Sequence, residues 1–188
     1  MTWFFDPLLP LYYERIVIDP PWGVDLYSKE GARKSALGKY DLMKDADIMA
    51  LPVGRLASMD CLLYCWATAP QLPLAIDCVK AWASSTSLFW SGERPHRPER
   101  SAWVRATASA LLARLLSSRP SETQSRQAIP QAIFNGIARE HSRKPVEFYD
   151  ICDRVMPHAR RADVFARESR AGWHSFGNEV TKFDEVVA

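Results

Sequence analysis

Hydrophobic positions along the chain form short continuous runs and longer stripes with helical spacing. Residues 16–18 (Ile-Val-Ile) and 61–66 (Cys-Leu-Leu-Tyr-Cys-Trp) are continuous runs, which are typical of short strands buried on both faces of a sheet. Residues 73–82 and 146–156 carry apolar side chains at near-helical spacing, which predicts two amphipathic helices. Because strands and helices alternate, we expect βα units and an α/β fold with a mostly parallel sheet.

Shorter segments complete this pattern. Residues 45–51 predict a short helix that Pro52 ends, and residues 163–167 predict a third short strand. Residues 172–180 are predicted to form a glycine-bounded loop. The polar stretch 23–39 is predicted to be a loop, either a solvated surface loop or a lid beside a binding site, because binding residues concentrate on loops held by rigid scaffolds.

Residues 84–127 differ in composition from the rest of the chain. They contain ten serines and seven arginines but no lysine or aspartate. Within them, only residues 111–116 indicate a helix and only residues 88–90 indicate a strand. Three interpretations compete: a flexible basic segment that contacts phosphate, a disordered insertion, and a segment translated in a shifted reading frame. The third is our preferred interpretation, and it predicts a poorly ordered or loosely helical segment.

Length and charge indicate an ordinary globular domain. The 188 residues are 47% hydrophobic and 24% charged, enough for one domain over residues 1–188 with a substantial core. The net charge of +2 is too small to indicate a nucleic-acid partner by itself.

The cysteines and the amino terminus indicate a reduced, soluble, intracellular protein. The four cysteines lack paired C-x-x-C spacing, so no metal site is expected, and Cys61 and Cys65 are expected to be reduced core residues. Residues 1–13 lack the basic and apolar regions of a signal peptide. No apolar run reaches membrane-spanning length.

The sequence Asp19-Pro20-Pro21-Trp22 directly follows the first predicted strand. Neither proline can donate to a sheet, and Pro20 holds Asp19 in an extended conformation, so the strand ends here. A carboxylate, two carbonyls and an indole therefore stand at the carboxyl end of a buried strand. In open α/β sheets, ligands bind at that edge.

These four residues, the Asp19–Trp22 corner, suit the recognition of a planar exocyclic amine. Asp19 and the Pro20 carbonyl can each accept a hydrogen bond from an NH2 group, while Trp22 offers an aromatic face for stacking. The lone pair of such an amine is delocalised into its ring, and two acceptors on its hydrogens favour the pyramidal geometry that makes the lone pair available. The alternative is a strand followed by a proline turn with a structural aspartate.

The Asp-Pro-Pro-Trp corner resembles the active-site motif of the MT-A70 family of N6-adenine methyltransferases. Further blocks resemble this family in order and spacing, and the resemblance covers roughly residues 16–82 and 128–181. These blocks are Leu51-Pro52-Val53-Gly54, the strand ending at Trp66, His141-Ser142-Arg143-Lys144-Pro145, Val164-Phe165-Ala166-Arg167, Gly172-Trp173 and Gly177-Asn178-Glu179.

The resemblance implies a Rossmann-like S-adenosylmethionine-dependent methyltransferase fold, with a mostly parallel sheet flanked by helices. It implies that Asp19, Pro20, Pro21 and Trp22 hold the target adenine and its N6 amine. It also assigns residues to the binding of the cofactor S-adenosylmethionine: Lys144, Phe165, Arg167, Asn178 and Glu179.

The function that the resemblance implies is methylation of the N6 amine of adenine in DNA. The partner is then double-stranded DNA with a flipped adenine, and the protein acts in the cytoplasm of a bacterial or phage-infected cell without a membrane partner. Two alternatives remain. One is an RNA adenine methyltransferase. The other is an inactive methyltransferase-like binding module or remnant, because the family has two strands and a glycine-rich loop where residues 84–127 stand.

Overall fold

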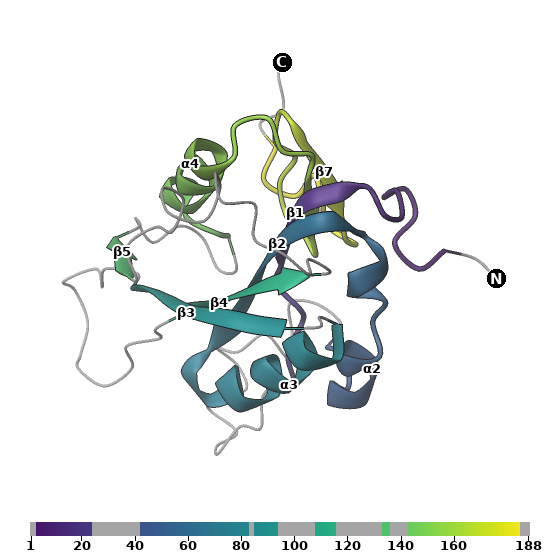
Figure 1. Cartoon of the computed structure of the whole chain (residues 1–188), viewed down its shortest axis with the longest axis vertical. Helices are drawn as coiled ribbons and strands as arrows, with labels where there is room; N and C mark the ends of the chain where they lie inside the picture. The colour runs from purple at the N-terminus through teal and green to yellow at the C-terminus, as the bar shows by residue number, and fades with distance from the viewer. Residues whose placement is uncertain are drawn as a thin grey trace.

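A computed structural model describes residues 3–23, 42–82, 85–93, 108–115, 133–135 and 143–184. Within these residues, seven strands form one sheet with helices on both faces (Figure 1). The strands are β1 (Tyr13–Ile18), β2 (Ala57–Thr68), β3 (Ser85–Glu93), β4 (Ala108–Leu115), β5 (Ile133–Asn135), β6 (Arg161–Val164) and β7 (Trp173–Phe176). The helices are α2 (Asp45–Met49), α3 (Leu72–Trp82) and α4 (Val146–Val155), with short 3-10 turns η2 (Val53–Arg55) and η3 (Ala69–Gln71).

The sheet is mostly parallel, in the order β5-β3-β4-β2-β1-β6-β7. Strand β1 runs parallel to both its neighbours, β2 and β6, and β6 runs parallel to β7. Strand β4 alone runs against its neighbours, β2 and β3. The carboxyl ends of β1, β2, β6 and β7 therefore meet at one edge of the sheet. This arrangement confirms the expected Rossmann-like fold class.

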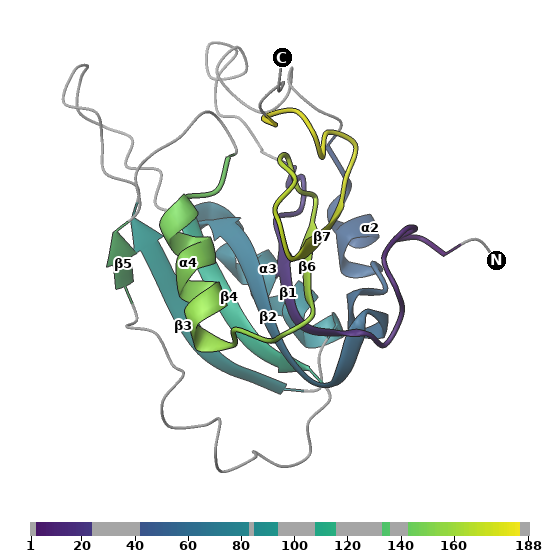
Figure 2. The same ribbon diagram turned by 90° about the horizontal axis from the view of Figure 1, so that it is seen from above.

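Strand β1 is buried on both faces because helices cover both sides of the sheet (Figure 2). Ile16 and Ile18 pack in a cluster that includes residues of α2 and α3. Val17, between them in sequence, packs in a second cluster with α4 residues such as Phe148 and Cys152. Alternation along the strand thus divides its side chains between two hydrophobic layers.

The three α-helices and the two apolar strands agree with the sequence predictions. Helices α2, α3 and α4 lie within one or two residues of the predicted helices, and β1 and β2 contain the predicted apolar runs. The predicted apolar stripe of α4 is only partly buried. Phe148, Tyr149 and Cys152 are buried, whereas Val146 is 37% exposed.

Two local predictions near the ends of the sheet need correction. The predicted glycine-bounded loop at residues 172–180 contains strand β7, and the strand predicted at residues 163–167 begins two residues earlier as β6. Strand β7 is a four-residue edge strand in which Trp173 is the buried side chain. Such a short strand has little hydrophobic alternation, so its pairing with β6 decides its conformation.

The predicted helix at residues 111–116 is wrong, because residues 108–115 form strand β4. The segment reads Ala-Ser-Ala-Leu-Leu-Ala-Arg-Leu, and most of these residues have high helix propensity. Hydrogen bonding to β2 on one side and β3 on the other overrides that local preference.

The expectation that residues 84–127 are poorly ordered or loosely helical is wrong for two of their parts. Residues 85–93 and 108–115 pair as β3 and β4 and continue the sheet from β2. The shifted-frame interpretation predicted that no complete sheet would draw strands from this segment, so the structure contradicts it. The other parts of 84–127, and residues 24–39 of the predicted loop, lie outside the described residues.

All four cysteines are free and buried, which confirms the expectation for Cys61 and Cys65. No helix among the described residues has the length and hydrophobicity that crossing a membrane requires.

Candidate active site

The backbone of the Asp19–Trp22 corner is tied to the elements around it. The Asp19 amide donates to the Val164 carbonyl in β6 at 3.2 Å, and the Trp22 amide donates to the Pro20 carbonyl at 2.8 Å. The Met43 amide donates to the Pro21 carbonyl at 3.1 Å. Both proline carbonyls thus already receive one hydrogen bond, and each keeps a second lone pair for a ligand amine.

Trp22 connects the corner to the core. Its side chain packs in the hydrophobic cluster under α2 and α3, and the residue is only 6% exposed. The indole Nε1 donates to the Trp66 carbonyl at 2.8 Å. This contact fixes the corner against β2. Stacking of a base on Trp22 stays a prediction, and little of the indole surface is exposed for it.

Register places three predicted site segments at one edge of the sheet. Ile18 pairs with Val164 in β6, and Val164 pairs with Phe176 in β7. The chain therefore leaves these three strands at the same level, through Asp19, Phe165 and Gly177. Neighbouring strands lie about 4.8 Å apart, so the outer two of these ends are roughly 10 Å apart.

Asp19 and Asn178, which 159 positions separate in sequence, therefore share the carboxyl edge of the sheet. This register is compatible with one site that includes Asp19 and the Gly177-Asn178-Glu179 block, and the assignment of these residues to a shared site stays a prediction.

The turns that follow β6 and β7 pack against each other through their backbones. Phe165 has a left-handed conformation with φ of 61°, and the Ala166 amide donates to the Phe176 carbonyl at 2.9 Å. A Cβ atom at Gly177 would lie 3.1 Å from the Ala166 oxygen and 3.2 Å from the Phe165 Cα. Gly177, whose φ is +155°, therefore permits the close approach of the two turns.

Arg167 and Glu179 form an ion pair between these two turns. The Arg167 Nη2 lies 2.9 Å from the Glu179 Oε2, and the Lys182 ammonium lies 2.5 Å from Oε1. The hydrogen bond from Lys182 and the charge of Arg167 lower the pKa of Glu179. Glu179 is thus an ionised hydrogen-bond acceptor at neutral pH, next to the exposed Asn178.

Lys144 lies between two carboxylates beneath the corner. Its ammonium is 3.2 Å from Asp163 Oδ1 and 3.8 Å from Asp19 Oδ2, and its side chain is only 4% exposed. Lys144 immediately precedes Pro145, the N-cap residue of α4. The segment before α4 thus places a buried cation near the ends of β1 and β6.

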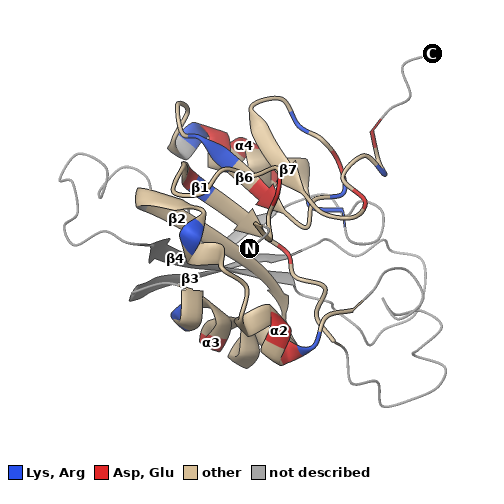
Figure 3. Ribbon diagram, turned by 90° about the vertical axis from the view of Figure 1, so that its right-hand side faces the viewer, with Lys and Arg blue, Asp and Glu red and all other residues tan. Residues whose placement is uncertain are grey.

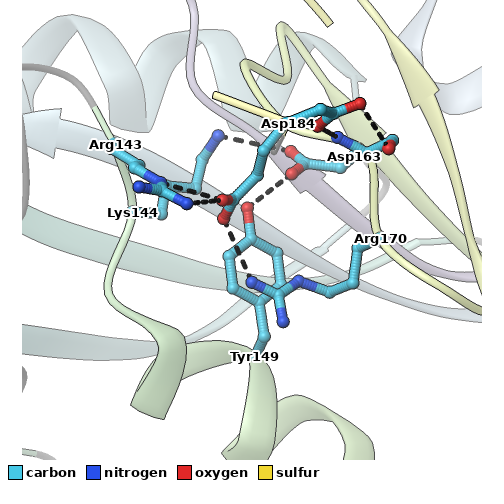
Figure 4. Close-up of polar contacts among 8 residues, drawn as sticks. Arg143, Lys144, Tyr149, Asp163, Arg170 and Asp184 are labelled. Atoms are coloured by element: carbon cyan, nitrogen blue, oxygen red, sulfur yellow. Dashed lines mark hydrogen bonds and ion pairs between the residues drawn. The ribbon is translucent and has the colours of Figure 1, made fainter. Parts of the chain in front are cut away.

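Tyr149 holds the other oxygen of Asp163 (Figure 4). Its hydroxyl donates to Asp163 Oδ2 at 2.5 Å. Burial, together with the negative charge of Asp163, raises the pKa of Tyr149 well above its usual value. The phenol therefore remains a protonated donor, and the Arg170 guanidinium lies over its ring at 4.1 Å from the centroid.

A second polar group involves Arg143 and Arg170, which Figure 4 shows near Tyr149. Glu168 accepts hydrogen bonds from Arg143 Nε at 2.8 Å and from Arg170 Nη2 at 3.1 Å. Sequence reasoning found neither Asp163 nor Tyr149 nor Glu168 as site residues. The available signal was Asp163 itself, an ionisable residue between the apolar Ala162 and Val164 in a predicted strand segment.

The sequence-predicted site residues thus fall into two groups at one edge. Asp19 and Lys144 are in contact, whereas Arg167 and Glu179 form the second group with Phe165 and Asn178 nearby in sequence. The second group supplies a carboxylate, an amide and a half-buried aromatic ring. This donor set fits the ribose hydroxyls and adenine of S-adenosylmethionine.

Charges of both signs lie near the site. In Figure 3, both acidic and basic segments lie on α4 and on the chain after β7. The described cations Arg143, Lys144, Arg167 and Arg170 all contact carboxylates. These cations therefore position the carboxylates of the site.

Comparison with known proteins identifies the family. The family model MT-A70 matches residues 13–179. The N(6)-adenine-specific methyltransferase METTL4 of Homo sapiens is 26% identical over 93% of this chain and 39% of its own length. The Type II methyltransferase M.MunI of Mycoplasma sp is 26% identical over 89% of this chain and 78% of its own length.

A plant relative, the N(6)-adenosine-methyltransferase MT-A70-like protein of Arabidopsis thaliana, is also 26% identical, over 88% of this chain and 23% of its own length. The chain thus spans about two fifths of the human relative and about a quarter of the plant relative. The family match covers β1 to β7 and both groups of predicted site residues, and on this evidence the chain belongs to the MT-A70 family.

Proposed function

We propose that this protein transfers a methyl group from S-adenosylmethionine to the N6 amine of adenine in DNA. One observation carries the proposal. The Asp-Pro-Pro-Trp corner stands at the carboxyl end of the inner strand β1, in register with the ends of β6 and β7. That edge is where open α/β sheets bind ligands, and Asp19 places a hydrogen-bond acceptor there.

In this proposal Asp19 orients the nucleophile. Its carboxylate and the second lone pair of the Pro20 carbonyl accept hydrogen bonds from the two N6 hydrogens. S-adenosylmethionine, when bound, supplies a methyl group on a sulfonium that is a good leaving group. The protein then contributes mainly by holding the nitrogen in line with the methyl carbon, a positioning effect.

The residues after β6 and β7 hold the cofactor in this proposal. Glu179 accepts from the ribose hydroxyls, and Asn178 and Phe165 contact the adenine. Arg167 positions Glu179 through the ion pair at 2.9 Å. Lys144, whose ammonium lies beside Asp19 and Asp163, is proposed to face the methionine carboxylate.

The proposed substrate is double-stranded DNA, from which the target adenine is flipped at a cost of a few kcal/mol. RNA is the competing substrate. The inactive alternative depended on the absence of two strands and a glycine-rich loop from residues 84–127. Strands β3 and β4 supply the two strands, whereas the segment has only one glycine, Gly92, so the assay below also tests this alternative.

The test is a methyl-transfer assay with labelled S-adenosylmethionine. Duplex DNA, single-stranded DNA and RNA of matched sequence are offered separately, and the nucleosides are then identified by mass spectrometry. We expect N6-methyladenine in the duplex DNA. Methyl transfer to RNA alone would show that RNA, not DNA, is the substrate. Binding of the cofactor without transfer to any of the three nucleic acids would refute the proposed activity.

A further inference from the structure

We propose that Asp163 and Tyr149 are positioning residues, which fix the Lys144 ammonium so that it orients the Asp19 carboxylate for the target amine. The inference rests on the proposed function and adds two residues to its site. Its structural basis is a chain of contacts that runs from Tyr149 through Asp163 and Lys144 to Asp19.

The register of the sheet brings the two carboxylates to one face. Ala162 and Val164 pack in the cluster under α2 and α3, so Asp163 between them points to the α4 face. Asp163 pairs with Val17, which also lies on the α4 face. Asp19 follows Val17 by two residues, and its carboxylate reaches the ammonium that enters from the start of α4.

The distances show which carboxylate sets the position of Lys144. The ammonium lies within hydrogen-bond distance of Asp163, at 3.2 Å, but 3.8 Å from Asp19. Lysine is a flexible chain that ends in a point charge, so its position depends on its tightest contact. Asp163 therefore fixes the ammonium, and the ammonium acts on Asp19 through its charge.

Tyr149 makes the Asp163 anchor rigid. The two oxygens of Asp163 have different partners, Lys144 on Oδ1 and Tyr149 on Oδ2. Tyr149 is itself held by the stacked guanidinium of Arg170 and by an edge contact with the Trp173 ring at 5.2 Å. The carboxylate of Asp163 is therefore fixed in both position and rotation.

Stability alone does not account for a charged pair at this place. Asp163 and Lys144 have side chains 5% and 4% exposed, and taking two charges out of water is costly. Replacement of such pairs by well-packed apolar residues is often neutral or stabilising. A geometric role at the adjacent Asp19 explains why a carboxylate and an ammonium occupy this position.

The test uses two conservative variants, Asp163→Asn and Tyr149→Phe, with Asp150→Asn as the matched control. Asp150 lies next to Tyr149 on α4 but is exposed. Single-turnover methyl transfer is measured with saturating cofactor and DNA, and the dissociation constants of both are measured by calorimetry. A displacement of about 1 Å costs on the order of 100-fold in rate, so we expect losses approaching that size in Asp163→Asn.

A smaller loss of rate is expected in Tyr149→Phe, because Asp163 keeps its contact with Lys144. Both variants should bind DNA as tightly as Asp150→Asn does. Any loss of cofactor affinity, which a displaced Lys144 would cause at the methionine carboxylate, should be much smaller than the loss of rate. In a Lys144→Met background, Asp163→Asn should cause no further loss of rate, because the residue that it positions is already absent. A purely structural role would instead give losses that add.

Transfer at the control rate in both variants would overturn the inference and leave the proposed function intact. So would a transfer rate that returns to the control value when the cofactor concentration is raised, because Asp163 would then serve the cofactor site. Additive losses in the Lys144→Met background would also overturn it. A wild-type protein that binds both ligands and transfers no methyl group would refute the proposed function and this inference together.

Discussion

Replacement of Lys144 by methionine should strongly destabilise the fold. Methionine keeps most of the apolar stem but removes the ammonium that lies 3.2 Å from Asp163. Among the described residues, the Asp163 carboxylate would keep only its hydrogen bond from Tyr149. The change therefore leaves a negative charge in a position where the side chain is only 5% exposed.

The expected magnitude follows from this burial. Removal of one partner of a buried ion pair typically costs about 3–5 kcal/mol, because the other charge stays buried without compensation. For a chain of this size, each kcal/mol lowers the melting temperature by about 2–4 °C, so the expected decrease is roughly 6–20 °C.

The matched control is Lys80→Met on α3. Lys80 pairs with Asp77 at 3.5 Å, but these side chains are 63% and 61% exposed. Exposed pairs contribute about 0–1 kcal/mol, so this variant should melt close to the wild type.

The measurement is thermal and urea unfolding of wild type, Lys144→Met, Lys80→Met and the double variant Lys144→Met/Asp163→Asn at pH 7. The double variant should recover part of the lost stability, because a neutral amide can still accept the hydrogen bond of Tyr149. A Lys144→Met protein as stable as Lys80→Met would refute the claim that Lys144 compensates a buried charge.

Three further predictions concern the fold and the cofactor edge. Gly54→Ala should lower the free energy of unfolding by about 1–3 kcal/mol, because its Cβ would clash with the Trp82 carbonyl oxygen. Gly23→Ala, where a Cβ has room, should lower it much less. Equal effects of the two variants would contradict the packing of η2 on α3. Glu179→Gln should lower stability by less than about 1 kcal/mol at pH 7 because the side chain is partly exposed. The hydrogen bond from Lys182 lowers the pKa of the Glu179 carboxyl below 4.5 in the folded protein. The stability difference between wild type and Glu179→Gln should therefore shrink as the pH falls through that lowered pKa. A stability difference that persists in acid would contradict this role of Lys182. All four cysteine thiols are buried and should react with a thiol reagent only after unfolding; rapid labelling of the native protein would contradict that burial.

The corner at Asp19 could be predicted because its signals are local. A three-residue apolar run followed by Asp-Pro-Pro predicts a buried strand with an abrupt end wherever the chain places it. The shared edge of Asp19 and Asn178 was not predictable from strand order, because the segment before Asn178 was predicted as a loop and forms strand β7. Only the family resemblance assigned both residues to one site.

The missed features depend on partners distant in sequence. The Ala- and Leu-rich segment of β4 has a helical preference that only pairing with β2 and β3 overrides. The role of Asp163 requires the register that turns it toward α4, and neither that register nor the 2.5 Å contact with Tyr149 is visible in the local sequence. Strands of only four residues, such as β7, are too short to carry a periodic signal of their own.

The central claim is that Asp19 places the N6 amine of adenine, and one comparison tests it most directly. Single-turnover methyl transfer to duplex DNA and the dissociation constant of S-adenosylmethionine are measured for wild type and Asp19→Ala. Removal of the carboxylate should abolish transfer of the methyl group while cofactor affinity stays close to that of the wild type, because the carboxylate orients the nucleophile. An equal loss of cofactor affinity and transfer rate would instead assign Asp19 a structural role and contradict the account.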